Sequence, residues 1–359
     1  MRLNDIQTRI PLWYENQIAI YLVGRVGRGK TTTISRAPAR IAKHLGKPAK
    51  AFGFVCIAGT LLNPPDAVGY MMPRNVGDHL EAVFTQPFWF RTDEGKLLTE
   101  YEGGIILIDE ADKMDVDVKK IMGEMALSGR LGPHRLPSGW VVWFAGNTAK
   151  DRSGSTKEYD HLINRRLEVT VDDDLESVLE FYAANNVHPV FTGFAKTNPQ
   201  VVFEEPPPVP GPWCTPRSLH QLANYGGALA KHNNGDVPTD HLFREEAAGK
   251  IGEGAAMSLF ATLDLQKIMP RFEEIVSRPK STALPESPDA QMMVCYVLAS
   301  RVTSENIVPV IEYVDRMPAE FSICFGKAAI ARDVKLVTTK GFQNWAKAHS
   351  SLMMSISTV

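Results

Sequence analysis

The chain has few cysteines and no close pair of them. Its 359 residues include four cysteines, which are widely separated: Cys56, Cys214, Cys295 and Cys324. Zinc sites and disulfide frameworks are normally encoded by closely spaced cysteines such as C-x-x-C. The sequence therefore disfavours both kinds of site, and we expect reduced, mostly buried thiols.

Long apolar runs are also missing. The chain has no stretch of 18 apolar residues, and its N-terminus carries Arg2, Asn4 and Asp5 where a signal peptide would need an apolar segment. These absences predict a soluble, cytoplasmic protein with no membrane partner.

Neither sign of charge dominates. The formal net charge is −2 at pH 7, and no tract is rich in lysine or arginine. A protein that coats nucleic acid by electrostatic attraction alone is therefore disfavoured, although a local basic surface stays compatible with this composition.

Five short apolar runs are present, each bounded by Gly, Asp or Asn, and such runs suit strands buried on both faces. Helical patterns lie between them, as in residues 115–128, where Asp115 is placed to cap the start and Gly129 to end the helix. This alternation predicts an α/β fold with a parallel, doubly wound, five-stranded sheet. The runs are Ile18–Val23, Phe52–Ile57, Ile105–Ile108, Val141–Ala145 and Leu167–Val171.

Prolines mark the expected interruptions. Pro38 lies well past the first turn of the helix that would follow residue 30, so we expect that helix to kink or break near Ala37. The proline-rich residues 205–214 predict a linker after an α/β domain of residues 1–204. The rest reads as helical, and a polar stretch at 277–289 divides it into a lid, 215–284, and a C-terminal subdomain, 285–359.

Residues 24–31 read Gly-Arg-Val-Gly-Arg-Gly-Lys-Thr and directly follow the first apolar run. This is a complete phosphate-loop pattern (Walker A), in which glycines let successive backbone N–H groups curl around a phosphate. Lys30 is expected to reach the β- and γ-phosphates, and the Thr31 hydroxyl to ligate Mg²⁺. A chance glycine-rich turn is the alternative, but the fixed positions and the strand-then-helix context predict nucleoside triphosphate binding. The predicted nucleotide-binding residues are Gly24, Arg25, Val26, Gly27, Arg28, Gly29, Lys30, Thr31 and Thr32.

Residues 104–110, Gly-Ile-Ile-Leu-Ile-Asp-Glu, place two carboxylates at the end of a buried strand, as a Walker B strand does. Asp109 would hold Mg²⁺ through water, and Glu110 would orient the water that attacks the γ-phosphate. The alternative is an acidic strand end that faces solvent. The second acid predicts hydrolysis in addition to binding.

Another apolar run, residues 141–146, ends at Asn147. An asparagine at this place can hydrogen-bond both a water and the γ-phosphate, so we assign Asn147 as a sensor. An asparagine chosen only for its turn propensity is the alternative.

Taken in chain order, these motifs resemble an AAA+ ATPase of the MoxR-like group, in the clade with an insert in the second helix. The resemblance covers about residues 18–230. It is carried by Walker A, by the Ile-Asp-Glu-Ala-Asp-Lys box ending at Lys113, by Asn147 and by His161-Leu-Ile-Asn-Arg-Arg166, with support from residues 65–69, 127–131 and 215–219.

The resemblance implies three functional arginines. Arg165 falls where the family has an arginine that acts on the neighbouring subunit's γ-phosphate, and Arg166 takes the usual aromatic position, so the doubled arginine leaves this assignment open between them. A surface pair that contacts the acidic run 172–174 is the alternative. Arg217 matches the arginine by which the lid reaches the γ-phosphate; otherwise it forms a salt bridge at a helix start.

The family insert would fall at about residues 70–90, which contain Phe84, Phe88, Trp89 and Phe90. These aromatic side chains would either face a pore or a client protein, or pack internally. No Asn-Lys-x-Asp guanine motif is present, which favours ATP over GTP.

The leading hypothesis is an ATPase that uses ATP and Mg²⁺, assembles into a homo-oligomeric ring, a hexamer by resemblance, and remodels a protein client. The family also implies a von Willebrand factor A domain protein as partner. One alternative is a motor or loader that acts on nucleic acid, with Arg74, Arg130, His134 and Arg135 as a basic surface. Another is a scaffold whose bound nucleotide is not turned over.

Overall fold

The computed structural model describes residues 1–148 and 160–350. The predicted C-terminal subdomain, 285–359, therefore extends beyond the described part of the chain at its last nine positions. Two compact units are present, Met1–Asp173 and Asp174–Val359. Within the described residues, no helix is long and apolar enough to cross a lipid bilayer.

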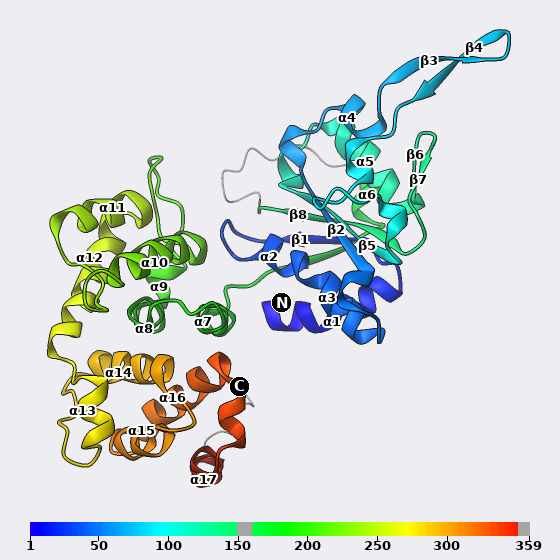
Figure 1. Ribbon diagram of the computed structural model, residues 1–359. Coiled ribbons are helices and arrows are strands. Elements are labelled where there is room, and N and C mark those ends of the chain that lie inside the picture. Colours follow the sequence, from blue (N-terminus) through cyan, green and yellow to red (C-terminus); the bar gives the residue numbers. More distant parts are fainter. Residues whose placement is uncertain (149–159, 351–359) are drawn as a thin grey trace. The chain divides into compact units, whose positions relative to one another are not determined.

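The first unit contains a five-stranded sheet in the order β2-β5-β8-β1-β9, and every neighbouring pair is parallel (Figure 1). The predicted α/β fold is confirmed, because each of the five apolar runs forms one of these strands. Their bounds are Ile20–Val23 (β1), Phe52–Ala58 (β2), Gly103–Asp109 (β5), Trp140–Gly146 (β8) and Leu167–Thr170 (β9).

Helices cover both faces of this sheet, and β1, β2, β5 and β8 are largely buried, whereas the edge strand β9 buries only Val169. In β5, Ile105 and Leu107 face the core that also contains Ile10 and Ile41, while Ile106 and Ile108 face the core that contains Met122. Because successive side chains of a strand point to opposite faces of the sheet, β5 contributes to two separate hydrophobic cores. The helices of this unit are Leu3–Glu15 (α1), Lys30–Ser35 (α2), Ala37–His44 (α3), Pro64–Val68 (α4), Val116–Ser128 (α5) and Asp160–Ile163 (α6).

Local sequence signals set several helix ends. The helix after the phosphate loop breaks at Arg36, and Pro38 lies in the first turn of α3, so the predicted interruption near Ala37 is confirmed. The Asp115 carboxylate accepts a hydrogen bond from the N–H of Asp117 at the start of α5, and Gly129 ends α5 in the left-handed conformation, as predicted.

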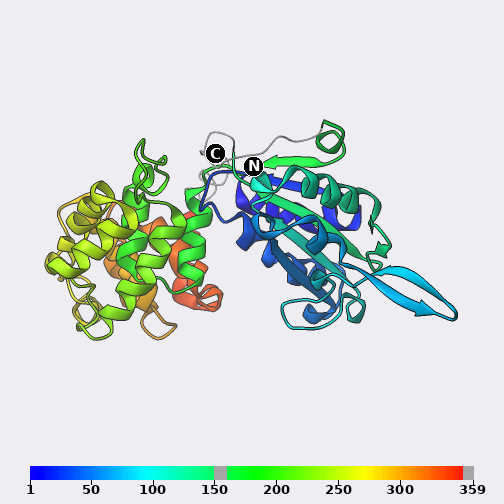
Figure 2. The same cartoon turned by 90° about the horizontal axis from the view of Figure 1, so that it is seen from above.

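The segment 70–90 forms an antiparallel hairpin, Met71–Val76 (β3) and His79–Phe84 (β4), that projects from the first unit (Figures 1 and 2). Of the aromatic residues in this segment, some pack internally and one is exposed, so neither interpretation of them holds for all. Trp89 and Phe90 are buried and stacked on each other, and Trp89 Nε1 donates to the Ala67 carbonyl at 2.9 Å. Phe88 is exposed. A second, short hairpin joins Arg130–Leu131 (β6) to His134–Arg135 (β7).

The second unit is helical throughout its described residues. The units divide at Asp173 and not at the proline-rich residues 205–214, because the helices before that stretch pack into the helical core: Tyr182, Phe191 and Val202 share it with Leu219 and Leu259. The helices are Leu175–Ala184 (α7), Pro189–Thr197 (α8), Pro199–Val202 (α9), Pro216–Ala230 (α10), His241–Ile251 (α11), Glu253–Asp264 (α12), Phe272–Ser277 (α13), Pro288–Arg301 (α14), Ile307–Val314 (α15), Ala319–Arg332 (α16) and Lys340–Ala348 (α17). No disulfide joins the four cysteines, which all lie in the described residues, and burial raises the pKa of the Cys56 thiol to about 11.

Candidate functional site

The phosphate loop joins the end of β1 to the start of α2. Gly27 and Gly29 have φ angles of 76° and 80°, a conformation that a side chain would strain. Lys30 begins α2 immediately afterwards. Gly27 and Gly29 are thus needed where the backbone turns.

The Lys30 ammonium is buried among oxygen atoms. Its side chain donates to the carbonyls of Gly24 at 2.6 Å and Arg25 at 2.9 Å, and to Asn147 Oδ1 at 3.1 Å. The residue is only 6% exposed. The fold therefore brings the predicted sensor, Asn147, to the phosphate-loop lysine, although 117 residues separate them in the chain.

Thr31 and Asp109 form the second contact of the site. The Thr31 hydroxyl donates to Asp109 Oδ2 at 2.6 Å. A hydroxyl and a carboxylate are the oxygen ligands that Mg²⁺ uses, usually completed by water and substrate phosphates. Among the described residues, no group of three His, Cys, Asp or Glu side chains gathers for a metal ion. Thr31 and Asp109 fit a metal ion that the nucleotide helps to hold.

Glu110 follows Asp109 in a left-handed backbone conformation, with φ 53° and ψ 35°. Such a conformation costs about 1–3 kcal/mol for a residue with a side chain, and it is concentrated at functional sites. The Glu110 N–H donates to Asp109 Oδ1 at 2.9 Å, and Glu110 Oε2 lies 3.4 Å from Lys113 Nζ. The strained turn thus places the second carboxylate just beyond the metal ligand.

Asp112 is a positioning residue that the sequence analysis did not single out. It is 3% exposed, and its Oδ1 accepts a hydrogen bond from the Asn147 N–H at 2.9 Å. The buried Lys119 of α5 donates to the Asp112 carbonyl at 3.1 Å. Asp112 therefore ties the sensor to the Walker B turn. The signal that was available is its place in the Asp-Glu-Ala-Asp run.

If this site hydrolyses ATP, as its motifs predict, Asp112→Ala should lower turnover by about 10- to 100-fold, because a catalytic group displaced by about 1 Å can lose this much rate. The affinity for ATP should change little, since Lys30 and the loop remain. Asp112→Asn keeps the acceptor oxygen and should retain most of the turnover. Steady-state kinetics measures the turnover, nucleotide titration the affinity, and melting curves the folding of each variant. An equal loss of turnover in both variants would show that the Asp112 oxygen does not position Asn147.

The side chain of Arg28 is buried and forms an ion pair. It is 2% exposed, and its Nε lies 2.6 Å from Asp173 Oδ1, just after β9. This ion pair also fixes the loop to the last residues of the first unit, which no local pattern indicated.

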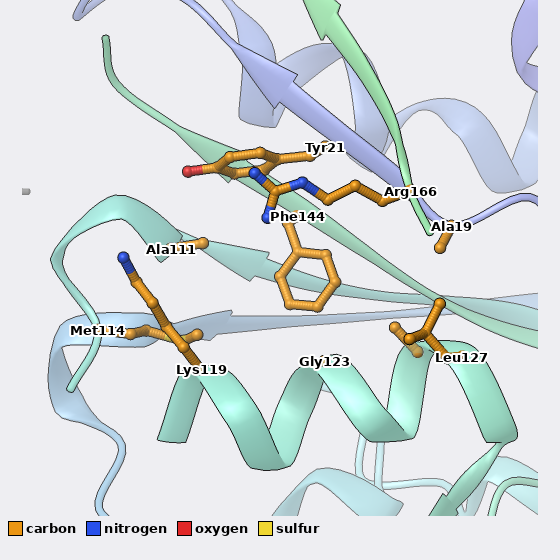
Figure 3. A pocket seen from close by; sticks show the side chains of 10 residues that line it. Ala19, Tyr21, Ala111, Met114, Lys119, Gly123, Leu127, Phe144 and Arg166 are labelled. Atoms are coloured by element: carbon orange, nitrogen blue, oxygen red, sulfur yellow. The ribbon is translucent and has the colours of Figure 1, made fainter. Parts of the chain in front are cut away.

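The two neighbouring arginines differ in environment. The Arg166 guanidinium lies 4.0 Å from the centre of the Tyr21 ring and 3.0 Å from Glu168 Oε2, beside a small cavity of about 30 Å³ between α5 and the sheet (Figure 3). Its side chain is 12% exposed. Arg165 is exposed. Of the two, Arg165 is thus presented to solvent, while Arg166 packs against the sheet.

Arg165 also lies far from its own phosphate loop. In the β1–β9 pair, Leu167 lies beside Ile20 at the amino end, and Thr170 lies beside Val23, where the loop begins. The length of β9, roughly 10 Å at about 3.3 Å per residue, therefore separates Arg165 from the edge that carries the site. Arg217 belongs to the second unit, where it is exposed in the first turn of α10.

No protein-family profile matches the chain, and no curated protein matches it in sequence. Among solved structures, a mutant of RuvB from Thermotoga maritima is similar at 13% identity and a TM-score of 0.39, over 78% of this chain and 77% of that one. NtrX from Brucella abortus, solved with ADP, is similar at 14% identity and a TM-score of 0.38, over 97% of this chain and 68% of that one. Similarity at this level says nothing about function.

Proposed function

We propose that the protein is an ATPase that requires Mg²⁺, of the AAA+ type. The observation that supports this most strongly is the convergence of Lys30, Thr31, Asp109 and Asn147 at one edge of the sheet. These groups would bind ATP and Mg²⁺ around the γ-phosphate. Glu110, next to the metal ligand, would orient the attacking water.

We further propose that the active unit is a homo-oligomeric ring, hexameric by resemblance. The exposed Arg165 lies at the opposite end of β9 from its own phosphate loop, so it would act on the nucleotide of a neighbouring subunit. Arg217 would sense the γ-phosphate from the helical unit; this role rests on the resemblance.

A protein client fits this chain better than nucleic acid. The β3–β4 hairpin exposes Met71, Met72 and Leu80, at 61%, 52% and 70%. Arg74 on the same hairpin lies opposite Glu81 in the strand pairing, so the hairpin carries both signs of charge. Nucleic acid is held mainly by uncompensated cations on phosphates, whereas apolar side chains suit a protein surface. A von Willebrand factor A domain protein is the partner that the resemblance suggests.

The ATPase rate should be measured against protein concentration at fixed ATP and Mg²⁺, with sizing by light scattering. We expect the rate per subunit to rise steeply as a ring-sized species forms, and to vanish when EDTA removes Mg²⁺. A constant rate from a monomer would contradict catalysis across subunits. DNA binding that weakens steeply with salt would instead favour the nucleic-acid motor.

A further inference from the structure

The second unit contains a cavity of about 460 Å³ that takes no part in the proposed ATPase site. It lies where the end of α7 and the start of α8 meet the C-terminal parts of α10, α14 and α16. Its volume falls within the range of about 300–1,000 Å³ that is usual for sites of small molecules.

Small residues keep this cavity open. Gly227 of α10, Ala299 of α14 and Ala328 of α16 all line it. A Cβ atom on Gly227 would meet only the Cβ of His188, at an ordinary contact distance of 3.6 Å. The glycine therefore relieves no clash between helices, and a larger side chain at this position would occupy the cavity.

The charged side chains of the cavity wall are all cationic. Lys231 and Arg332 line it, and no Asp or Glu does so in the described part of the chain. Lys231 is exposed and Arg332 is half-buried, and because neither has a carboxylate within 4.0 Å among the described residues, their positive charges favour an anionic occupant.

Hydrogen bonds to backbone carbonyls hold two side chains of the cavity wall, Arg332 and His188, in place. The Arg332 guanidinium donates to the carbonyls of Ser300 and Val302 at the end of α14. His188 Nε2 donates to the Gly235 carbonyl at 3.0 Å. Burial lowers the pKa of His188, so this ring is neutral at pH 7 and the positive charge comes from Lys231 and Arg332.

We propose that this cavity binds a small organic anion, with its phosphate or carboxylate group held by Lys231 and Arg332 and its body against the alanine-lined wall. The site is separate from the phosphate loop, and this inference does not depend on the ATPase proposal. Binding itself is therefore the readout.

The test is calorimetric titration of the full chain with glucose 6-phosphate, a phosphate ester, and with citrate, a carboxylate. We expect saturable binding of at least one probe, and the probe that binds identifies the source of the anionic group. Lys231→Glu should weaken it on the order of tenfold or more, because an attraction becomes a repulsion. Gly227→Met should abolish it by filling the cavity. Arg332 is left unchanged because its loss would expose the carbonyls that it caps.

Matched controls separate this site from general effects. Lys250→Glu makes the same charge change near the end of α11, and Gly249→Met adds the same side chain at a helix position with open space around it. Both should bind like the unchanged protein, and so should Lys30→Ala, whose phosphate loop is impaired. No saturable binding of either probe, or equal weakening by Lys231→Glu and Lys250→Glu, would overturn the proposal.

Discussion

Replacing Glu110 by glutamine is expected to reduce ATP turnover by about 10²- to 10⁴-fold, the usual contribution of a general base. Glutamine has nearly the same shape but cannot accept a proton from the attacking water. ATP affinity should stay within about threefold, because Lys30, Thr31 and Asp109 supply the proposed phosphate and metal contacts. Phosphate release measures turnover, and titration with a fluorescent ATP analogue measures affinity.

The matched control for this variant is Glu94→Gln. Glu94 also lies near a lysine, with 3.8 Å between its Oε2 and Lys96 Nζ, but it lies outside the proposed site. Its replacement should leave turnover unchanged. If Glu110→Gln kept full turnover, Glu110 would not be the catalytic base, and a scaffold with structural nucleotide would become the better hypothesis for any residual binding.

Replacing Arg165 by alanine should lower turnover of the assembled protein by about 10³-fold or more, the range measured for arginines that stabilise charge on a transferred phosphoryl group. ATP binding should change little, because Arg165 lies at the far end of β9 from its own phosphate loop. Turnover at ring-forming concentrations and light scattering together distinguish loss of catalysis from loss of assembly.

Arg166→Ala provides the comparison. This side chain packs on Tyr21 and pairs with Glu168, so its loss should mainly lower the melting temperature, by the equivalent of about 1–2 kcal/mol, with a smaller effect on turnover. If Arg166→Ala lost as much turnover as Arg165→Ala while remaining folded, the two arginines would exchange roles.

Mixing the two inactive variants tests action between subunits directly. A subunit with Arg165→Ala keeps Glu110, and a subunit with Glu110→Gln keeps Arg165. In a mixed ring, some interfaces would combine both intact groups, so we expect turnover well above that of either variant alone. No recovery from rings shown to be mixed would contradict an arginine supplied by the neighbour.

The sequence by itself determined the parts of this protein that depend on short stretches of chain. The phosphate loop needs glycine where φ is positive, and Gly27 and Gly29 stand there. The five apolar runs became the five strands, and four of these are largely buried, as suits strands of a parallel sheet that helices cover on both faces. Pro38 and Gly129 set helix ends through their own backbone preferences.

Only the tertiary structure decided which distant residues meet, because such contacts depend on how the strands are ordered and not on local spacing. Thr31 reaches Asp109 across 78 residues, and Asp112 holds the backbone of Asn147. Packing on Tyr21 distinguishes Arg166 from Arg165, whereas the resemblance had favoured Arg165 as the functional arginine and left the assignment open. The helices of residues 174–202 joined the helical unit because their apolar faces pack there, whereas the proline-rich stretch had suggested a later boundary.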